Sequence, residues 1–120
     1  MNPHMMPKLR SEEITRATRD MHCTLRLASF AGLPCSCEET LVPCHLPVIG
    51  KGMGTKVTDL AVVAGCQVCH DLLDGRDPKG IKLAEMYPGA WSMRLLNALV
   101  ETQAVLLDKG IIEVPGGKVV

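Results

Sequence analysis

Six cysteines in a chain of 120 residues constrain the fold of this protein more than any other feature of its sequence. Cys66 and Cys69 form a Cys-x-x-Cys pair, a spacing at which two thiolates reach one metal ion from a tight turn. The opening residues carry no apolar segment of a signal peptide, so we expect a reduced, cytoplasmic setting. In that setting, closely spaced cysteines indicate metal binding rather than disulfides.

Two further thiolates would complete the closed tetrahedral set typical of structural Zn²⁺, and they must come from upstream cysteines. We favour a site made of four residues: Cys23, Cys35, Cys66 and Cys69. Cys37 lies two residues from Cys35 and is an alternative ligand, whereas Cys44 is expected to be structural or incidental. Buried free thiols, a secreted disulfide protein and a thioredoxin-like redox pair remain alternatives to this site. The redox pair is the least favoured of them, because no βαβ pattern surrounds Cys66 and Cys69.

The composition fits one domain with its own core. Hydrophobic residues make up 47% of the chain, but only one Phe, one Tyr and one Trp are present, so a metal ion would help to stabilise so small a core. The formal net charge is zero, which does not indicate a generally basic nucleic-acid binder. No apolar run is long enough to span a bilayer, so no membrane partner is expected. We expect a flexible arm over residues 1–11 and a single domain over residues 12–120.

The pattern of apolar residues predicts a mixture of strands and helices, and therefore an α+β fold. Alternating or β-branched stretches predict strands at 23–30, 40–46 and 58–66, and a short final strand at 111–114. Loops are expected at 31–39 and in the glycine-rich segment 50–56. Helices are expected at 12–20, from about His70 to a break between Gly75 and Pro78, and at 92–110, with Ser92 as the N-cap.

Two histidines and two aspartates lie around the cysteine pair. His70 directly follows Cys69, and Asp74 lies four residues later, so both side chains share one face of a helix and can chelate a divalent ion. His45 closes the short strand before the glycine-rich loop, and Asp59 lies between the two histidines in the sequence.

The stretch Gly52–Arg76, GMGTKVTDLAVVAGCQVCHDLLDGR, resembles the YbcO-like nucleases of phages and lambdoid prophages. The resemblance extends over nearly the whole chain. It includes Leu9-Arg10, the segment from Cys23 to Leu27, Cys35, His45, Asp59-Leu60 and the late stretch ETQAVLLDKGII at 101–112.

That family is similar in turn to HNH endonucleases of the ββα-metal, or His-Me finger, type. The resemblance implies a zinc-stapled ββα-metal core with a short antiparallel hairpin and an added C-terminal helix. It implies that His45 is a general base, that Asp59 orients it, and that His70 and Asp74 hold a catalytic Mg²⁺ or Mn²⁺. Flanking phosphates would be held by three basic residues: Lys51, Lys56 and Arg76.

The expected function is therefore metal-dependent hydrolysis of DNA phosphodiester bonds, in phage or prophage DNA recombination or processing. The expected partners are DNA and phage recombination proteins, and the expected location is the cytoplasm of the bacterial host. The alternative is a non-catalytic zinc module that binds DNA or another protein. Cys44 and Asp59 motivate this alternative. Many HNH enzymes carry a carboxylate or His where Cys44 stands, just before the general base, and usually Asn where Asp59 stands, in the middle of the motif.

Overall fold

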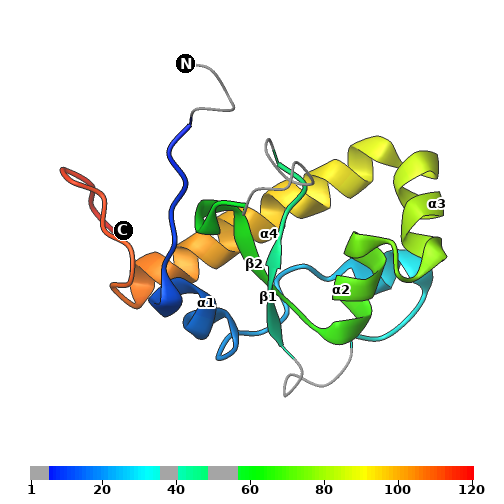
Figure 1. The fold of residues 1–120 in the computed structure, drawn as a ribbon, viewed down its shortest axis with the longest axis horizontal. Helices are drawn as coiled ribbons and strands as arrows, with labels where there is room; N and C mark the ends of the chain where they lie inside the picture. Colours follow the sequence, from blue (N-terminus) through cyan, green and yellow to red (C-terminus); the bar gives the residue numbers. More distant parts are fainter. Residues whose placement is uncertain (1–5, 36–40, 49–56) are drawn as a thin grey trace.

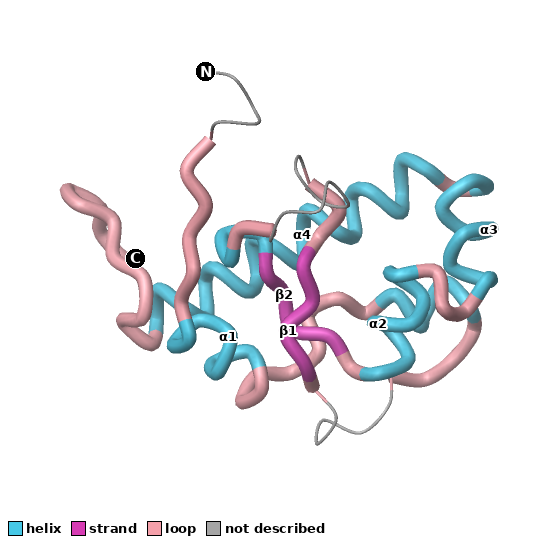
Figure 2. Tube along the Cα trace, viewed as in Figure 1, coloured by secondary structure: helices cyan, strands magenta, loops and turns pink. Residues whose placement is uncertain are grey.

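The fold is organised around a two-stranded antiparallel hairpin, with helices arranged on both sides of it (Figures 1 and 2). The structure is a computed structural model that describes residues 6–35, 41–48 and 57–120. The predicted α+β class, the antiparallel hairpin and the long C-terminal helix are confirmed in these residues. The α-helices are α1 (Glu12–Thr18), α2 (Gln67–Asp74), α3 (Pro78–Met86) and α4 (Pro88–Asp108), the short 3₁₀ helices are η2 (Leu27–Ala31) and η4 (Asp59–Ala61), and the strands are β1 (Val42–His45) and β2 (Val62–Gly65).

Strand β2 is buried along its whole length because both of its faces are covered. Val63 packs into a core that includes Leu25, Leu27 and Leu72. The neighbouring side chains of β2 point the other way, and they join a second core with Ile14, Met21 and Leu106. A strand covered on both faces reads as a continuous apolar run, which is the pattern of the sequence Val-Val-Ala-Gly.

The hairpin register places Val42 opposite Gly65 and His45 opposite Val62. Gly65 lies where the backbone comes close to the side chains of the core. A Cβ atom at this position would lie 2.6 Å from Sγ of Cys44 and 3.1 Å from Cδ2 of Leu25. The hairpin therefore packs this tightly only with glycine at position 65.

Hydrogen bonds of Leu9 fasten the N-terminal segment to the start of η4. The amide of Leu9 donates to Oγ1 of Thr58, and the amide of Asp59 donates to the carbonyl of Leu9. Ser11 then caps α1, since its Oγ accepts a hydrogen bond from the amide of Ile14. Part of the stretch expected to be a flexible arm thus lies against the residues that precede β2.

Helices α2 and α3 pack closely across a short link. Helix α2 ends at Gly75, whose φ of 78° is favourable only for glycine, and Asp77 caps α3 just before Pro78. A Cβ atom at Gly80 would lie only 2.0 Å from the carbonyl oxygen of Leu72. Gly80 therefore allows the backbones of α2 and α3 to approach each other.

Helix α4 runs along the molecule behind the hairpin (Figure 1). Its inner side buries four residues spaced by seven, four and four positions, which places them on one face of the helix: Trp91, Ala98, Thr102 and Leu106. The hydroxyls of Thr102 and Thr24 share a buried hydrogen bond of 2.8 Å. This bond joins α4 to the segment that leads into η2.

The expected strand at 23–30 is wrong. Arg26 has a φ of 43°, and residues 27–31 form the 3₁₀ helix η2. The amides of both Thr24 and Leu25 donate to the carbonyl of Ala64, which is not the pattern of a strand ladder. Cys23 lies close to three other cysteines, and Leu25 and Leu27 lie in the core. The alternating apolar residues of this segment are therefore buried without belonging to a sheet.

Other boundaries also differ from the expectations. The expected final strand at 111–114 is wrong: Ile111 and Ile112 donate their amides to the carbonyl of Leu106 and close the end of α4. The expected strand at 58–66 is shortened to β2, because η4 precedes it. Helix α2 begins one turn before His70, α3 was not expected, and α4 begins at Pro88, so that Ser92 lies inside it.

Within the described part of the chain, no helix combines the length and the apolar composition that crossing a membrane requires.

Candidate functional site

The four cysteines expected to bind zinc lie together. Cys66 is the N-cap of α2 and Cys69 lies in its first turn, while Cys23 and Cys35 lie before and after η2. All four sulfur atoms lie within 4.8 Å of one another, and the Sγ atoms of Cys35 and Cys69 are 3.8 Å apart. Four thiolates at about 2.3 Å from a zinc ion are separated by about 3.8 Å, so the arrangement fits a tetrahedral metal site. Cys37, the alternative to Cys35, lies outside the described residues.

Backbone amides support negative charge on the cluster. The amides of Arg26 and Cys66 point to Sγ of Cys23 at 3.5 and 3.4 Å, and the amide of Ala28 points to Sγ of Cys69 at 3.4 Å. Arg26 itself has a left-handed backbone conformation and precedes the first residue of η2. Amides directed at thiolates stabilise the ionised form that binds metal.

The thiols share their protons unequally. A hydrogen bond from the Cys69 thiol, together with the backbone amides, lowers the pKa of Cys23 to about 5 against the effect of burial. Donating that hydrogen bond and being buried both raise the pKa of Cys69. Burial and the charge of Cys23 raise the pKa of Cys35 to about 11. Without a cation the cluster therefore favours one thiolate, whereas a bound metal ion would compensate the charge of several.

Cys44 lies outside this cluster. Its side chain is completely buried in the core beneath Gly65. None of the five cysteines in the described residues forms a disulfide. The structural role expected for Cys44 agrees with this position.

His45 and Asp59 form a close pair at the end of the hairpin where β1 stops and η4 leads into β2. His45 is the last residue of β1 and Asp59 opens η4, and the distance between Nε2 and Oδ1 is 2.8 Å. An ionised carboxylate can only accept, so Nε2 of His45 is the donor of this hydrogen bond. His45 is the histidine that the resemblance pairs with Asp59.

Asp59 is held from three directions. The amide of Ser11 donates to Oδ2 at 2.8 Å, and the guanidinium of Arg10 lies 3.5 Å from Oδ1. Arg10 also donates to the carbonyl of Val57. Burial raises the pKa of Asp59, but the hydrogen bonds from His45 and Ser11 and the charges of His45 and Arg10 outweigh it and lower the pKa overall. Asp59 is therefore a buried carboxylate that is ionised at neutral pH.

Arg10 and Ser11 were not expected to support the site. They lie 49 and 48 residues before Asp59, and the bonds that join them depend on how the N-terminal segment crosses η4. Leu9-Arg10 belongs to the residues that carry the family resemblance, but nothing in the sequence indicates that the amide of Ser11 meets Asp59.

His70 and Asp74 form a second pair on α2, one helical turn apart. The distance between Nε2 of His70 and Oδ2 of Asp74 is 2.8 Å, and both side chains are partly exposed. Arg76 donates to Oδ2 of Asp74 at 3.1 Å, and its Nη2 also lies 3.3 Å from Nδ1 of His70. An imidazole, a carboxylate and a guanidinium thus meet at the end of α2.

The structure brings the expected site residues into three groups. Among the described residues, the four cysteines are the one set of three or more His, Cys, Asp and Glu side chains gathered closely enough to hold one ion. His45 is joined to Asp59, and His70 to Asp74 and Arg76. Lys51 and Lys56, expected to bind phosphate, lie outside the described residues.

The cysteine cluster is also tied to α4. Arg26 donates through Nη2 to both carboxylate oxygens of Glu101, at 2.6 and 2.7 Å. Arg94 reaches the same carboxylate at 3.1 Å and the carbonyl of Thr24 at 3.3 Å. Burial raises the pKa of Glu101, but the two guanidiniums outweigh it and lower the pKa overall.

A family model described as "Putative nuclease YbcO" matches residues 12–108 of the chain. The protein belongs to the YbcO family. The YbcO match begins with the first residue of α1 and ends with the last residue of α4, so it contains every helix and strand of the described chain. The name of the YbcO family is consistent with a nuclease, that is, a hydrolase acting on nucleic acids. The comparisons with curated proteins and with solved structures gave no match.

Proposed function

We propose that this YbcO protein is a metal-dependent endonuclease of the HNH, or ββα-metal, type that hydrolyses phosphodiester bonds of DNA. The observation that carries the proposal is the His45–Asp59 pair at 2.8 Å, placed on a hairpin that leads directly into the helix with His70 and Asp74. A strand histidine followed by a helix histidine is the order that a ββα-metal nuclease needs. We further propose phage or prophage DNA recombination or processing as its setting, with phage recombination proteins as partners in the bacterial cytoplasm.

In this proposal His45 is the general base. Asp59 accepts a hydrogen bond from Nε2 and orients the ring, and His45 would take a proton from the attacking water. The buried carboxylate also stabilises the imidazolium that forms after the proton moves. Because Ser11 and Arg10 hold Asp59 in turn, the orientation of the ring is fixed before substrate arrives.

His70 and Asp74 would hold a divalent cation such as Mg²⁺ or Mn²⁺. Such a cation supplies electrostatic stabilisation of the charge that develops on the phosphate and the leaving oxygen. The donor set fits a hard ion in part, since one carboxylate and one imidazole lie 2.8 Å apart on a single helix face. Arg76 contacts both side chains and would bind a flanking phosphate, together with Lys51 and Lys56.

The cysteine cluster has a separate, structural role in the proposal. A zinc ion held by Cys23, Cys35, Cys66 and Cys69 would fix the first turn of α2 against η2. His70 follows Cys69 directly, so its place on the helix depends on this anchor. Four cysteine ligands would fill every coordination position of the zinc ion, so it would have no position for water or substrate. This zinc is therefore not the catalytic ion of the proposal.

The test is cleavage of supercoiled plasmid and of branched DNA by the zinc-loaded protein in Mg²⁺ or Mn²⁺. His45→Ala should lower the cleavage rate about 100-fold or more, the size of a lost general base. His22→Ala is the matched control, because His22 is exposed and carries none of the proposed roles. If the wild type and His45→Ala are equally inactive on all substrates, the proposal that this protein is a nuclease is refuted.

One observation favours the alternative of a non-catalytic zinc module. Cys44 directly precedes His45 but is buried, so it offers no ligand to an ion beside that histidine. The alternative predicts one zinc per chain, no second divalent ion by calorimetry, and DNA or protein binding that His45→Ala leaves unchanged.

A further inference from the structure

The outer side of helix α4 is apolar and exposed. Met93, Leu96 and Val100 are 55%, 53% and 58% exposed, although the opposite side of the same helix already lies in the core. A helix that is apolar on both sides is normally covered on both sides. These three residues follow each other by three and four positions, so they form one continuous stripe.

This outer stripe carries no charge. We define it by six positions: Gly89, Met93, Leu96, Asn97, Val100 and Ala104. The two charged residues within the central turns of α4, Arg94 and Glu101, pair with each other beside the stripe at 3.1 Å. An uncharged stripe attracts no phosphate backbone, so nucleic acid does not suit it as a partner.

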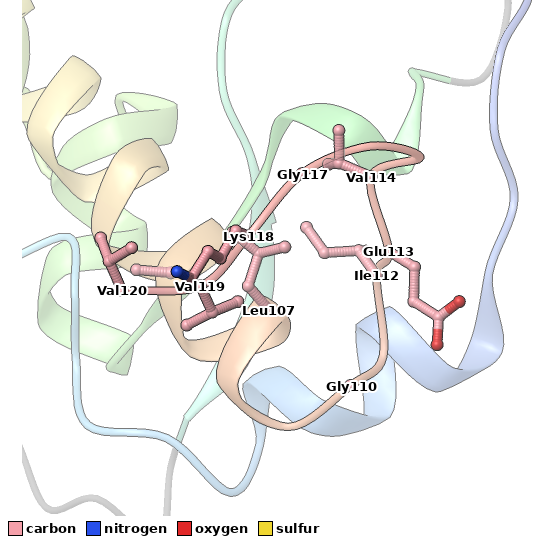
Figure 3. A pocket seen from close by; sticks show the side chains of 10 residues that line it. Leu107, Gly110, Ile112, Glu113, Val114, Gly117, Lys118, Val119 and Val120 are labelled. Carbon is pink, nitrogen blue, oxygen red and sulfur yellow. The ribbon is translucent and has the colours of Figure 1, made fainter.

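The stripe continues into a groove at the end of α4. A hollow of about 740 Å³ lies between α4 and residues 110–120, and Figure 3 shows Lys118 and Val119 lying beside Leu107. Its apolar lining includes Leu107, Ile112, Val114 and Val119, together with Ala104 of the stripe. Its charged lining is one residue of each sign, Glu113 and Lys118. Ala104 thus belongs to both features and makes them one surface.

We propose that this surface is the contact between two copies of the chain, packed with their α4 helices antiparallel about a two-fold axis. A two-fold interface places the same patch against itself, so a charged patch would oppose like charges whereas this stripe does not. With the axis between Leu96 and Val100, Leu96 of one copy faces Val100 of the other. Met93 then lies over the small side chain of Ala104, which matches a large residue with a small one.

The area of the stripe alone is smaller than a stable dimer needs. A helix of 21 residues is about 31 Å long, and a stripe about 10 Å wide covers roughly 300 Å² per copy. Stable interfaces bury about 800 Å² per partner, so the ends of the helix must contribute. Tyr87 is 51% exposed and lies just before α4. Its distance from the two-fold axis along the helix is about the same as that of the groove, which lies at the C-terminal end of α4. In the antiparallel pair it reaches the groove of the second copy.

The test is sedimentation of the zinc-loaded wild type from about 1 to about 300 µM, a range that spans the affinity of a small interface. We expect a concentration-dependent monomer–dimer equilibrium. Leu96→Lys and the uncharged Val100→Gln should each weaken dimerisation, by about 10-fold or more for the lysine. Met6→Lys is the control, because it also places a charge at an exposed apolar residue but lies far from α4 in the sequence, and it should leave the equilibrium unchanged.

Zinc content and melting temperature of each variant, measured on the same samples, separate a lost interface from a lost fold. A wild type that stays monomeric throughout the range would overturn the proposal and leave the stripe to a different protein. Dimers of Leu96→Lys and Val100→Gln as tight as those of the wild type would also overturn it. The outcome does not depend on nuclease activity.

Discussion

At the scale of single residues, Asp59 connects more of the structure than any other side chain of the proposed site. It is 5% exposed and receives hydrogen bonds from the end of β1 and from the segment before α1. A buried carboxylate is unfavourable unless it is paired, and Asp59 is paired on both oxygens. These hydrogen bonds stabilise the fold, and they also hold the ring of His45 in one orientation.

The net lowering of the pKa of Asp59 makes its contribution depend on pH. Since the pKa is lower in the folded state, the contribution is complete well above the unfolded pKa of about 4 and is lost as pH falls towards the folded pKa. Asp59→Asn should therefore destabilise the protein by about 1–3 kcal/mol at pH 7 and by progressively less below about pH 4.

The measurement is the difference in unfolding free energy between wild type and Asp59→Asn, followed from pH 7 down to the lowest pH at which both proteins keep their metal ion and unfold cooperatively. The gap should begin to narrow as the pH approaches the unfolded pKa of Asp59. Asp20→Asn, at an exposed position, should show almost no difference at any pH in this range. A gap at pH 7 no larger than that of Asp20→Asn would contradict the ionic role.

At the scale of elements, glycines decide how closely the strands and helices pack. The absence of a side chain at Gly65 leaves room for the sulfur of Cys44 on the neighbouring strand, and its absence at Gly80 leaves room for the carbonyl of Leu72 in α2. Both positions lie next to elements that carry proposed site residues. The packing of the backbone around these glycines therefore determines where His45 and His70 stand.

Gly65→Ala should destabilise the protein by about 1–3 kcal/mol, because the added methyl overlaps the sulfur of Cys44. Removing the sulfur makes room, so Gly65→Ala should cost less in a Cys44→Ala background. Chemical denaturation of the wild type, both single variants and the double variant gives the coupling energy. Additive effects would show that the overlap with Cys44 is not the cause.

Gly80→Ala should be more severe, since its methyl would meet main-chain atoms of Leu72 that cannot move aside. We expect a loss of about 3 kcal/mol or more and displacement of α3. The matched control is Gly89→Ala in α4, where no atom lies within 4 Å and the change should stabilise the helix by up to about 1 kcal/mol. Thermal melts compare the two, and similar Tm values would contradict this account of the contact.

The sequence allowed some of these elements to be predicted and not others. The cysteine cluster was predictable in part because Cys66-x-x-Cys69 is a local pattern, and β2 because it is an apolar run. Helix α3 was missed because Gly75 and Pro78 suggest a break, although Pro78 starts the helix and Gly80 serves its packing. The contact of Ser11 with Asp59 has no signal in the sequence, since it depends on tertiary structure.

At the scale of the whole molecule, the cysteine cluster joins segments that are far apart in the chain. Cys23 and Cys35 flank η2, and Cys66 and Cys69 begin α2, more than 30 residues later. With so few aromatic residues to fill the core, an ion at this point would supply a large part of the folding free energy.

Removal of the metal by a strong chelator should therefore abolish cooperative melting. Cys69→Ser should reproduce this loss, and its purified protein should contain little metal by mass spectrometry. Cys44→Ala is the control, since its sulfur is equally buried but lies outside the cluster, and it should keep one metal ion per chain. Unchanged melting after chelation would contradict the structural role of the ion.

Arg26 lies at once beside the cysteines and beside the longest helix. Its amide faces Sγ of Cys23, and its guanidinium clasps Glu101 of α4. One residue therefore links the cysteine cluster to the longest helix. As a consequence, we expect these two parts of the molecule to lose their structure in one transition, because a change at the cluster also displaces the side chain that contacts Glu101.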